Sequence, residues 1–266
     1  KLPDAVEEEI SAWVMSEEAM AADTLPTGAG VGRVSHDQTT ATNLYIDHLV
    51  ATIAPLNDDK TQPKPLKGLK IVADCANGAT SVVAPEALRR AGADVTVLDI
   101  SEAQLEQDRT VARRENLELA TVRSSMTDLS MFKNETFDII VHPVSNVFIP
   151  HIQPVWNEAF RVLKKGGVLM SGFMNPVFYL FDEKLEAEGV LQVKYPLPYS
   201  DLDHLSKDEL ERKGDAIEFG HSLTDQIQGQ IAAGFIITGF FEDTFGGERL
   251  LDRFCPSFVA TRAVKP

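Results

Sequence analysis

Residues 137–142 read FDIIVH and residues 158–169 read EAFRVLKKGGVL, and these two stretches decide the fold of the chain. The first is a short run of apolar and β-branched residues, which is typical of a buried strand. The second places apolar residues at helical spacing, passes through Gly166 and Gly167, and ends in another apolar run. Because glycine commonly ends a helix, we predict a helix over 152–164 and a strand over 167–172.

The same alternation extends on both sides of this segment. Strands are predicted over 69–74, 94–98 and 117–122, and helices over 85–91 and 102–114. Strands that alternate with helices favour parallel pairing and right-handed crossovers. Two further strands, over 234–242 and 257–263, have no convincing helix between them. We therefore expect an α/β fold with a doubly wound, mostly parallel Rossmann-like sheet and an antiparallel C-terminal strand pair.

The first part of the chain has a different pattern. Residues 5–22 carry apolar side chains at helical spacing among glutamates, and residues 37–53 predict a second helix. The helix-breaking stretch LPTGAGVG lies between them at 25–32, and a charged, proline-rich linker occupies 57–67. We therefore divide the chain into an N-terminal helical segment with its linker, residues 1–65, and an α/β domain, residues 66–266.

Composition limits the classes of function. The formal net charge is −15 and no basic stripe is present, which disfavours a nucleic-acid partner and favours a small-molecule substrate. Two isolated cysteines give no metal or disulfide pattern, and no apolar run is long enough to span a membrane. We expect a cytoplasmic protein without a metal site or a membrane partner, and the oligomeric state stays open. Because the chain begins at Lys1, we also expect a fragment or an engineered sequence.

The two stretches quoted first resemble the post-I region of class I S-adenosylmethionine-dependent methyltransferases. In that family an F-D-x-[IV] strand is followed by E-x-x-R-V-L-K-P-G-G-x-L, and here Lys165 replaces the usual proline. The segment VLDIS at 97–101 resembles the acid-ended second strand of the same family. The resemblance covers about residues 95–266. It implies S-adenosylmethionine as the cofactor and methyl transfer to a small-molecule acceptor.

The front end resembles a different family, the bacterial phosphoglucosamine mutases. The resemblance is carried by KLPDAVEEEI at 1–10, GRV at 32–34, GLKIVADCANGA at 68–79 and APE at 84–86, and it covers about residues 1–97. The metal loop D-G-D-x-D-R of that family is absent, as are its sugar-binding and C-terminal phosphate loops. We therefore expect a chimera joined near residues 95–99, whose first βαβ unit, residues 66–97, is mutase-like. We predict one sheet that runs continuously across the join. A catalytically inactive fold chimera and a mutase fragment without its catalytic loops are the alternative functions.

The methyltransferase resemblance implies a cofactor site at the carboxyl ends of the first strands. The family turn D-x-G-x-G-x-G corresponds here to DCANGAT at 74–80, where Asp74 keeps the acid and Gly78 keeps one glycine. Ala76 and Thr80 stand where glycines are expected, and a Cβ at these positions pushes the ligand outward. Impaired cofactor binding is therefore one expected outcome.

Residues after the second and third strands complete the predicted cofactor site. The resemblance implies that Asp99, with Ile100 beside it, binds the ribose hydroxyls of the cofactor. The alternative is a solvated acid that caps the helix beginning near residue 101. Ser125, Met126 and Asp128 follow the third strand, where the family contacts adenine.

Residues after the fourth strand are the candidates for contact with the methyl group and the acceptor. We predict that His142 contacts the cofactor and acts as a general base, with a purely structural histidine as the alternative. Asn146, Phe173 and Tyr179 are the substrate candidates, although core packing is the commoner role of such aromatic residues. Methyl transfer needs little from side chains, because the donor sulfonium is already activated.

Overall fold

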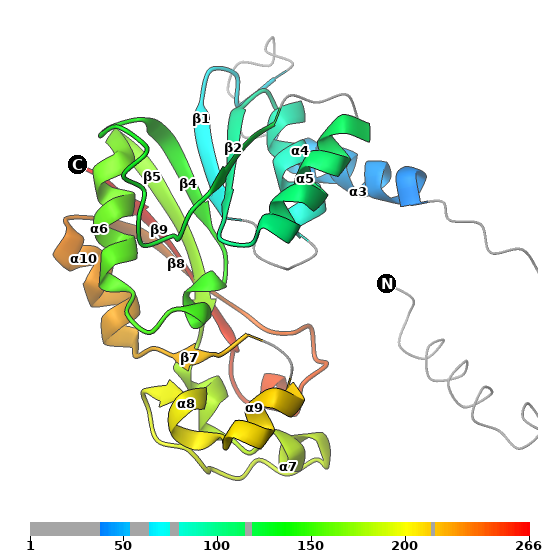
Figure 1. Ribbon diagram of the computed structural model, residues 1–266, viewed down its shortest axis with the longest axis vertical. Helices are drawn as coiled ribbons and strands as arrows, with labels where there is room; N and C mark the ends of the chain where they lie inside the picture. Colours follow the sequence, from blue (N-terminus) through cyan, green and yellow to red (C-terminus); the bar gives the residue numbers. More distant parts are fainter. Residues whose placement is uncertain (1–37, 54–63, 75–79, 115–118, 214–215) are drawn as a thin grey trace, which may run out of the picture. The chain divides into compact units, whose positions relative to one another are not determined.

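The computed structural model describes residues 38–53, 64–74, 80–114, 119–213 and 216–266 (Figure 1). The chain divides into two units, Lys1–Ala41 and Thr42–Pro266. Helix α3 (Gln38–Ile53) begins in the first unit and continues into the second, as predicted for 37–53. The predicted helix over 5–22 and the linker at 57–63 lie outside the described residues.

The second unit contains a seven-stranded sheet with the order β3-β2-β1-β4-β5-β9-β8. Its strands are β1 (Lys70–Asp74), β2 (Asp94–Asp99), β3 (Ala120–Arg123), β4 (Phe137–His142), β5 (Leu163–Met174), β8 (Ile236–Asp243) and β9 (Phe258–Val264). Strands β1 to β5 pair in parallel, whereas β9 lies antiparallel between β5 and β8. This confirms the predicted Rossmann-like sheet with its antiparallel C-terminal pair.

The sheet is continuous across the boundary between the two resemblances. Strand β1, from the mutase-like stretch, pairs with β2 in the register Lys70↔Asp94. It also pairs with β4 in the register Ile71↔Ile139. The predicted continuity is confirmed. The strand order reverses between β1 and β4, so the carboxyl ends of these two strands flank the switch point where ligands bind in such sheets.

Helices cover both faces of the sheet (Figure 1). Helices α4 (Thr80–Arg90) and α5 (Glu102–Arg114) pack on one face, where Val97 contacts Leu105. Helices α6 (Gln153–Val162) and α10 (Gly229–Ala233) lie on the other face, together with Leu98. Val97 and Leu98 are neighbours in β2 and point to opposite faces, so one strand supplies both layers of the core.

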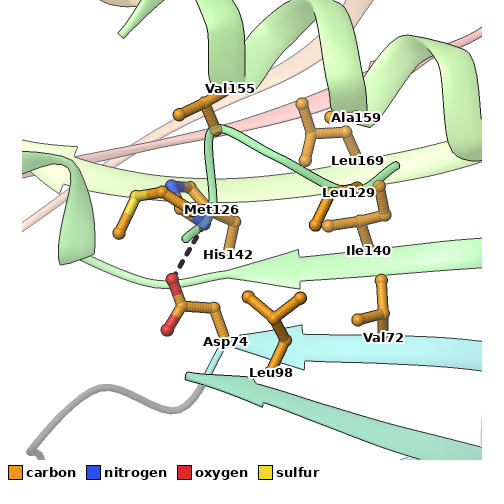
Figure 2. Close-up of a pocket in the computed structure, with 10 residues that line it drawn as sticks. All are labelled: Val72, Asp74, Leu98, Met126, Leu129, Ile140, His142, Val155, Ala159 and Leu169. Carbon is orange, nitrogen blue, oxygen red and sulfur yellow. Dashed lines mark ion pairs between the residues drawn. The ribbon is translucent and has the colours of Figure 1, made fainter. Parts of the chain in front are cut away.

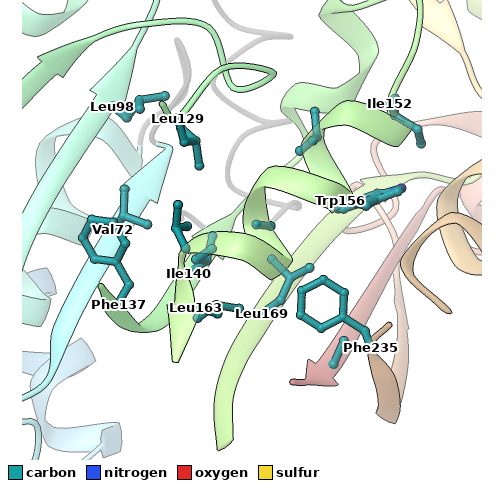
Figure 3. Close-up of a cluster of buried hydrophobic side chains, with 14 residues drawn as sticks. Val72, Leu98, Leu129, Phe137, Ile140, Ile152, Trp156, Leu163, Leu169 and Phe235 are labelled. Carbon is teal, nitrogen blue, oxygen red and sulfur yellow. The ribbon is translucent and has the colours of Figure 1, made fainter. Parts of the chain in front are cut away.

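The largest buried cluster lies between the sheet and α6 (Figure 3). Trp156 and Leu169 are fully buried in it. The Trp156 indole N–H donates to the carbonyl of Asp225 at 3.0 Å. A Cβ at Gly229 would lie 2.7 Å from Cδ1 of Trp156, so glycine lets α10 approach α6 closely. This cluster fixes the C-terminal segment beneath the carboxyl edge of the sheet.

Helix α6 ends earlier than the sequence predicts. Leu163 is already extended, with φ −72° and ψ 141°, and β5 begins there. The ammonium group of Lys164 contacts the Asp138 carboxylate at 2.8 Å, and Asp138 also accepts from the backbone N–H of Lys70. These bonds join β5, β4 and β1 at their starting ends, which explains the extended chain after Val162.

The segment between β5 and β8 carries short elements that the sequence analysis did not predict. They are η4 (Pro176–Leu180), α7 (Glu183–Ala187), β6 (Tyr199–Ser200), α8 (Asp201–His204), α9 (Lys207–Lys213), β7 (Phe219–Gly220) and the π-helix η5 (Thr224–Gln228). Strands β6 and β7 pair as a separate antiparallel ribbon. Helix η3 (Ser145–Phe148) follows β4, and η6 (Leu250–Arg253) precedes β9. Within the described part of the chain, no helix combines the length and the apolar character needed to cross a membrane.

Candidate functional site

A cleft of about 280 Å³ lies at the carboxyl ends of β1, β2 and β3, and we term it the strand-end cleft. It is lined by Asp74, Leu98, Asp99, Ile100, Ser101, Ser124, Ser125, Met126, Ser145, Phe148, Ile149 and Ala216. Five of the residues predicted for the cofactor site therefore lie together: Asp74, Asp99, Ile100, Ser125 and Met126. Ala76 and Gly78 lie outside the described residues.

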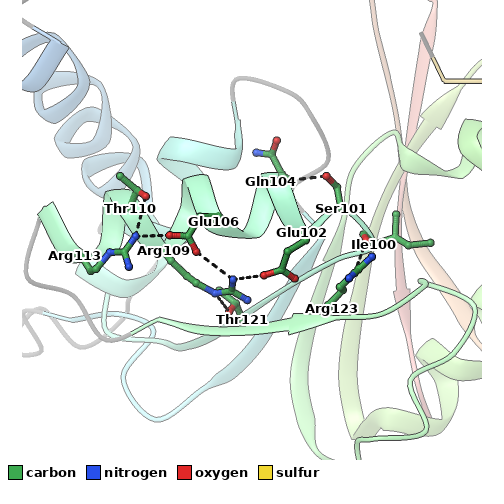
Figure 4. Close-up of polar contacts among 10 residues, drawn as sticks. All are labelled: Ile100, Ser101, Glu102, Gln104, Glu106, Arg109, Thr110, Arg113, Thr121 and Arg123. Atoms are coloured by element: carbon green, nitrogen blue, oxygen red, sulfur yellow. Dashed lines mark hydrogen bonds and ion pairs between the residues drawn. The ribbon is translucent and has the colours of Figure 1, made fainter. Parts of the chain in front are cut away.

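Asp99 ends β2 at the wall of this cleft. Its Oδ1 accepts a hydrogen bond from the backbone N–H of Ser101 at 2.7 Å, just before α5 begins. The helix itself is capped by the Ser101 hydroxyl, which accepts from the backbone N–H of Gln104 at 3.3 Å. Burial raises the pKa of the Asp99 carboxyl, and the negative charge of Asp74 adds to this effect. The bond from Asp99 to Ser101 is compatible with its place in the cleft. Arg123 donates to the Ile100 carbonyl at 3.2 Å and joins β3 to this strand end (Figure 4).

The loop after β3 carries Ser125 and Met126, and the EAFR motif of α6 holds it. Glu158 accepts from the backbone N–H of Leu129 at 2.7 Å. Arg161 donates to the Leu129 carbonyl at 2.8 Å and also pairs with Glu158. The spacing of Glu158 and Arg161, one turn apart on α6, therefore has a structural role, because their bonds to Leu129 position one wall of the cleft.

Asp128 lies in the same loop but does not line the strand-end cleft. Its side chain is exposed and its Oδ1 accepts from the backbone N–H of Ser130 at 2.9 Å. Hydrogen bonding to Ser130 holds the pKa of Asp128 below its usual range. The prediction that Asp128 contacts adenine therefore has no support from its position.

Asp74 and His142 face each other across the switch point of the sheet (Figure 2). Nδ1 of His142 lies 3.3 Å from Oδ2 of Asp74, and the Ser145 hydroxyl donates to the same oxygen at 2.5 Å. Burial lowers the pKa of the imidazole, but the hydrogen bond and charge of Asp74 act in the opposite direction and raise it overall. Both groups border a small, largely apolar cavity of about 30 Å³, which has room for about one water molecule.

His142, Asn146 and Phe173 are less accessible than their predicted roles require. His142 is 4% exposed, and its second ring nitrogen, Nε2, lies 2.7 Å from Oδ1 of Asn146. Asn146 and Phe173 are fully buried and line neither cleft. The positions of Asn146 and Phe173 give no support to the prediction that they contact the acceptor, because other side chains already enclose them.

Tyr179 lines a second cleft of about 390 Å³, which we term the aromatic cleft. It is lined by Phe178, Tyr179, Phe181, Glu183, Glu186, Tyr195, Tyr199, Asp201, Leu205, Glu218 and Arg249. The rings of Tyr179 and Tyr199 stack with centroids 5.0 Å apart. Their hydroxyls donate to Glu218 at 3.1 Å and to Asp201 at 2.9 Å, respectively. The two clefts have no lining residue in common.

The sequence analysis missed part of the strand-end cleft. Ser145 and Phe148 lie in helix η3 shortly after β4, and Ile149 follows it. Their closeness in sequence to the end of β4 could have indicated that they lie near the cleft. Ala216 arrives from the segment after β5, and no pattern in the sequence indicates this approach. The buried side chains of Gln226 and Gln230, which lie beneath Asn146, were also missed.

Helix α5 has a charged face that carries Arg109 and Glu102, and it also carries a buried acid, Asp108. On the outer face, Arg109 contacts Glu102 at 2.6 Å and donates to the Thr121 hydroxyl at 2.9 Å (Figure 4). Asp108 is 4% exposed, and its Oδ2 has no hydrogen-bond partner among the described residues. Burial, followed by the charge of Asp99, raises the pKa of Asp108 to about 6.

Comparison with known proteins gives a consistent result for most of the chain. The methyltransferase domain family model matches residues 74–171. The uncharacterized methyltransferase YbaJ of Bacillus subtilis (strain 168) is 51% identical over 217 residues, which are 80% of this chain and 83% of that protein. An S-adenosylmethionine dependent methyltransferase from Mesorhizobium loti has a similar structure, with a TM-score of 0.57 and 17% identity, over 77% of this chain and 94% of its own. At that identity the likeness concerns the fold alone.

A second group of relatives matches a smaller part of the chain. The phosphoglucosamine mutase of Bifidobacterium longum (strain DJO10A) is 79% identical over 101 residues, and that of Bifidobacterium adolescentis is 72% identical over 101 residues. The match covers 38% of this chain and 21% of each mutase. The chain therefore spans about a fifth of these relatives. The methyltransferase match covers 80% of this chain and the mutase match covers 38% of it, so the two matches overlap.

Proposed function

Because this chain belongs to the methyltransferase family, we propose that it transfers the methyl group of S-adenosylmethionine to a small-molecule acceptor, with the cofactor held in the strand-end cleft. The observation that carries the proposal is the convergence of Asp74, Asp99 and Met126 on one cleft at the switch point of the sheet. Ligands of open α/β sheets bind at this position.

The residues of the strand-end cleft suit the chemistry of this cofactor. Asp99 offers a carboxylate for the ribose hydroxyls, and Ile100 and Met126 offer apolar surface for the adenine ring. Asp74 and Ser145 offer polar atoms for the amino acid part. A pocket with apolar walls and a few convergent polar groups is typical of cofactor sites.

The proposed reaction assigns a limited role to the protein. When bound, S-adenosylmethionine supplies a methyl group that its sulfonium has already activated. The chain then contributes binding, orientation and the exclusion of water. The net charge of −15 supports a small-molecule acceptor over a nucleic acid. The cytoplasmic location and the division at residue 65 stay predictions.

Titration calorimetry with S-adenosylmethionine and S-adenosylhomocysteine tests the proposal. We expect each ligand to bind with one-to-one stoichiometry and to raise the melting temperature, because a ligand that binds the folded state stabilises it. Methionine and adenosine, titrated separately, are the matched controls, since each carries part of the cofactor. Absence of any heat or thermal shift with either cofactor, in a protein that unfolds cooperatively, contradicts the proposal.

One observation favours a second candidate, an inactive chimera that keeps only the methyltransferase fold. The turn at 74–80 has Ala76 and Thr80 where the methyltransferases place glycines, and this stretch belongs to the mutase-like part of the sequence. A mutase fragment is the third candidate, and the fifth of the mutase length that the chain spans gives it little support. The calorimetric result separates the first candidate from the other two.

A further inference from the structure

A series of buried, hydrogen-bonded polar side chains extends from the strand-end cleft beneath β4. Asp74 contacts Nδ1 of His142 at 3.3 Å, and Nε2 of His142 lies 2.7 Å from Oδ1 of Asn146. The Asn146 amide then donates from Nδ2 to Oε1 of Gln226 at 2.9 Å. Asn146 is 0% exposed and Gln226 is 1% exposed, so water does not substitute for these partners.

The end of this series that lies away from the cleft is held by the C-terminal elements. The π-helix η5 presents Gln226, whose carbonyl accepts from Nε2 of Gln230 at 2.9 Å. Oε1 of Gln230 in turn accepts from the Thr261 hydroxyl of β9 at 3.0 Å. A π-helix is rare and often occurs at functional sites. Here its carbonyl at Asp225 also accepts from the Trp156 indole, so the position of Gln226 is fixed from two sides.

The orientation of the Asn146 amide determines the hydrogens on His142. Because Nδ2 of Asn146 donates to Gln226, its Oδ1 faces the imidazole, and a carbonyl oxygen can only accept. Nε2 of His142 must therefore carry a hydrogen. On the other side, Nδ1 faces the carboxylate oxygen of Asp74, which is also an acceptor. Only the doubly protonated ring donates to both partners.

We propose that His142 is a positioning residue, held as an imidazolium between Asn146 and Asp74, and that it fixes the Asp74 carboxylate at the edge of the strand-end cleft. Its effect on the cofactor rests on the proposed function, whereas its charge state does not. An imidazolium has no lone pair to accept a proton, so His142 does not act as a general base in this arrangement.

The surroundings of the ring agree with a buried cation balanced by one carboxylate. Asp74 is the charged group that contacts it, and Trp156 of α6 lies edge-on with ring centroids 6.0 Å apart. Asp99 is the other nearby acid, beyond Asp74. Nε2 of His221 donates to the carbonyls of Asn146 at 3.0 Å and Ile149 at 2.9 Å, and burial lowers the pKa of this ring. The pKa of His142 is raised overall, because Asp74 outweighs the effect of burial.

Nitrogen NMR of the imidazoles in the ligand-free protein tests the charge state. The His142 signals are assigned by their loss in His142→Gln, and the exposed His151, replaced in His151→Gln, is the matched control. We expect both ring nitrogens of His142 to be protonated at pH 7. A neutral ring with an unprotonated Nε2 would mean that the Asn146 amide points the other way, and it would overturn the proposal.

A double-mutant cycle with Asp74→Asn and His142→Gln, also without ligand, tests the coupling of the two groups. A raised folded-state pKa stabilises the protein below the unfolded pKa of histidine, near 6.5, and this contribution is lost as pH rises through the folded pKa. We therefore expect a coupling in melting temperature at pH 6 that disappears at high pH. Absence of coupling at pH 6 would overturn the proposal.

Binding of S-adenosylhomocysteine supplies the functional arm. We expect His142→Gln to weaken binding roughly tenfold, the factor that one pKa unit of interaction represents, and to flatten its pH dependence. His151→Gln should change neither. If the wild type binds nothing, the proposed function fails, while the two ligand-free measurements still decide the role of His142. If the wild type binds and His142→Gln binds equally well at every pH, the positioning role is overturned.

Discussion

The strand-end cleft and the aromatic cleft are of similar size, about 280 and 390 Å³, but they are built in different ways. The strand-end cleft is formed where parallel strands end, and its acids, Asp74 and Asp99, are the last residues of β1 and β2. The aromatic cleft is formed by the short elements after β5 and by Arg249. One cleft follows from the topology of the sheet, and the other follows from packing within one inserted segment.

The polar groups of the two clefts also differ in how they are satisfied. In the aromatic cleft, Tyr199 donates to Asp201, and Arg249 binds Glu186 at 2.5 Å while its guanidinium lies 4.7 Å from the centroid of Phe178. These groups largely satisfy one another. Beside the strand-end cleft, Asp99 and Asp108 have raised pKa values because burial disfavours their charged forms. Burial also raises the pKa of Tyr179 and of Tyr199 in the aromatic cleft, so perturbed pKa values occur beside both clefts. The position of the strand-end cleft at the switch point of the sheet is what favours it as the binding site.

The largest expected effect is on ligand affinity, and it decides directly which of the two clefts binds the ligand. Asp99→Ala should weaken the binding of S-adenosylhomocysteine by about 1.5–3 kcal/mol, which is the range for a hydrogen bond to a charged group. Calorimetric titration of the purified variant measures this loss. The fold should survive, because Asp99 lies at the end of β2 rather than in the core.

Asp94→Ala is the matched control, because Asp94 is an exposed residue of the same type at the opposite end of β2. It should leave the affinity unchanged. If Asp99→Ala binds as tightly as the wild type, the ligand does not occupy the strand-end cleft.

The wall of the strand-end cleft provides the next test. Arg161→Met removes the donors to the carbonyls of Leu129 and Phe132, and it leaves Glu158 without its cationic partner. We expect the free energy of unfolding to fall by about 1–3 kcal/mol, the cost of leaving buried polar groups unsatisfied. The affinity for S-adenosylhomocysteine should fall as well, because the loop that carries Met126 loses its support.

Urea denaturation and calorimetry measure the two effects of Arg161→Met. Arg113→Met is the control, since Arg113 pairs with Glu106 on the exposed face of α5, where such pairs contribute little. A stable Arg161→Met variant with normal affinity would show that the EAFR motif does not hold this wall.

The position of the strand-end cleft could be predicted from the sequence for a physical reason. Strand ends follow from hydrophobic pattern and topology, so the sequence alone places Asp74, Asp99 and Ile100 at one edge of the sheet. The prediction for Asp128 depended on the path of a loop rather than on the end of a strand, and Asp128 does not line the strand-end cleft. A loop path is set by contacts such as those of Glu158 and Arg161, which a local pattern does not reveal.

The aromatic cleft could not be predicted from the sequence for a related reason. Its helices and strands are short, and elements such as Tyr199–Ser200 are too brief to carry a periodic signal. The hydrogen bond between the buried side chains of Asn146 and Gln226 was not predicted, because it joins residues far apart in the chain. Tertiary pairing of this kind leaves no trace in local periodicity, so Asn146 was interpreted as a residue that contacts the acceptor.

A smaller effect is expected within the aromatic cleft. Tyr199→Phe removes the hydroxyl that donates to Asp201, a residue that is 2% exposed. We expect a loss of about 1 kcal/mol in the free energy of unfolding, the usual net contribution of one hydrogen bond. Thermal and urea denaturation check the loss, with the exposed Tyr45→Phe as control. The affinity for S-adenosylhomocysteine should not change, and a clear decrease would mean that the two clefts act as one site.

The last prediction concerns the buried acid behind the strand-end cleft. The pKa of Asp108 is about 6 in the folded protein, whereas an ordinary aspartate titrates near 4, so the folded state holds its proton over that interval and the unfolded state does not. Stability therefore falls as pH rises from about 4 to about 6 and stays lower above it. Asp108→Asn removes the charge and keeps the shape, so it should raise the free energy of unfolding by about 1 kcal/mol at pH 7.5, with little gain at pH 4.5. Urea denaturation at both values measures the difference, and an equal effect at both would show that the charge of Asp108 is not the cause.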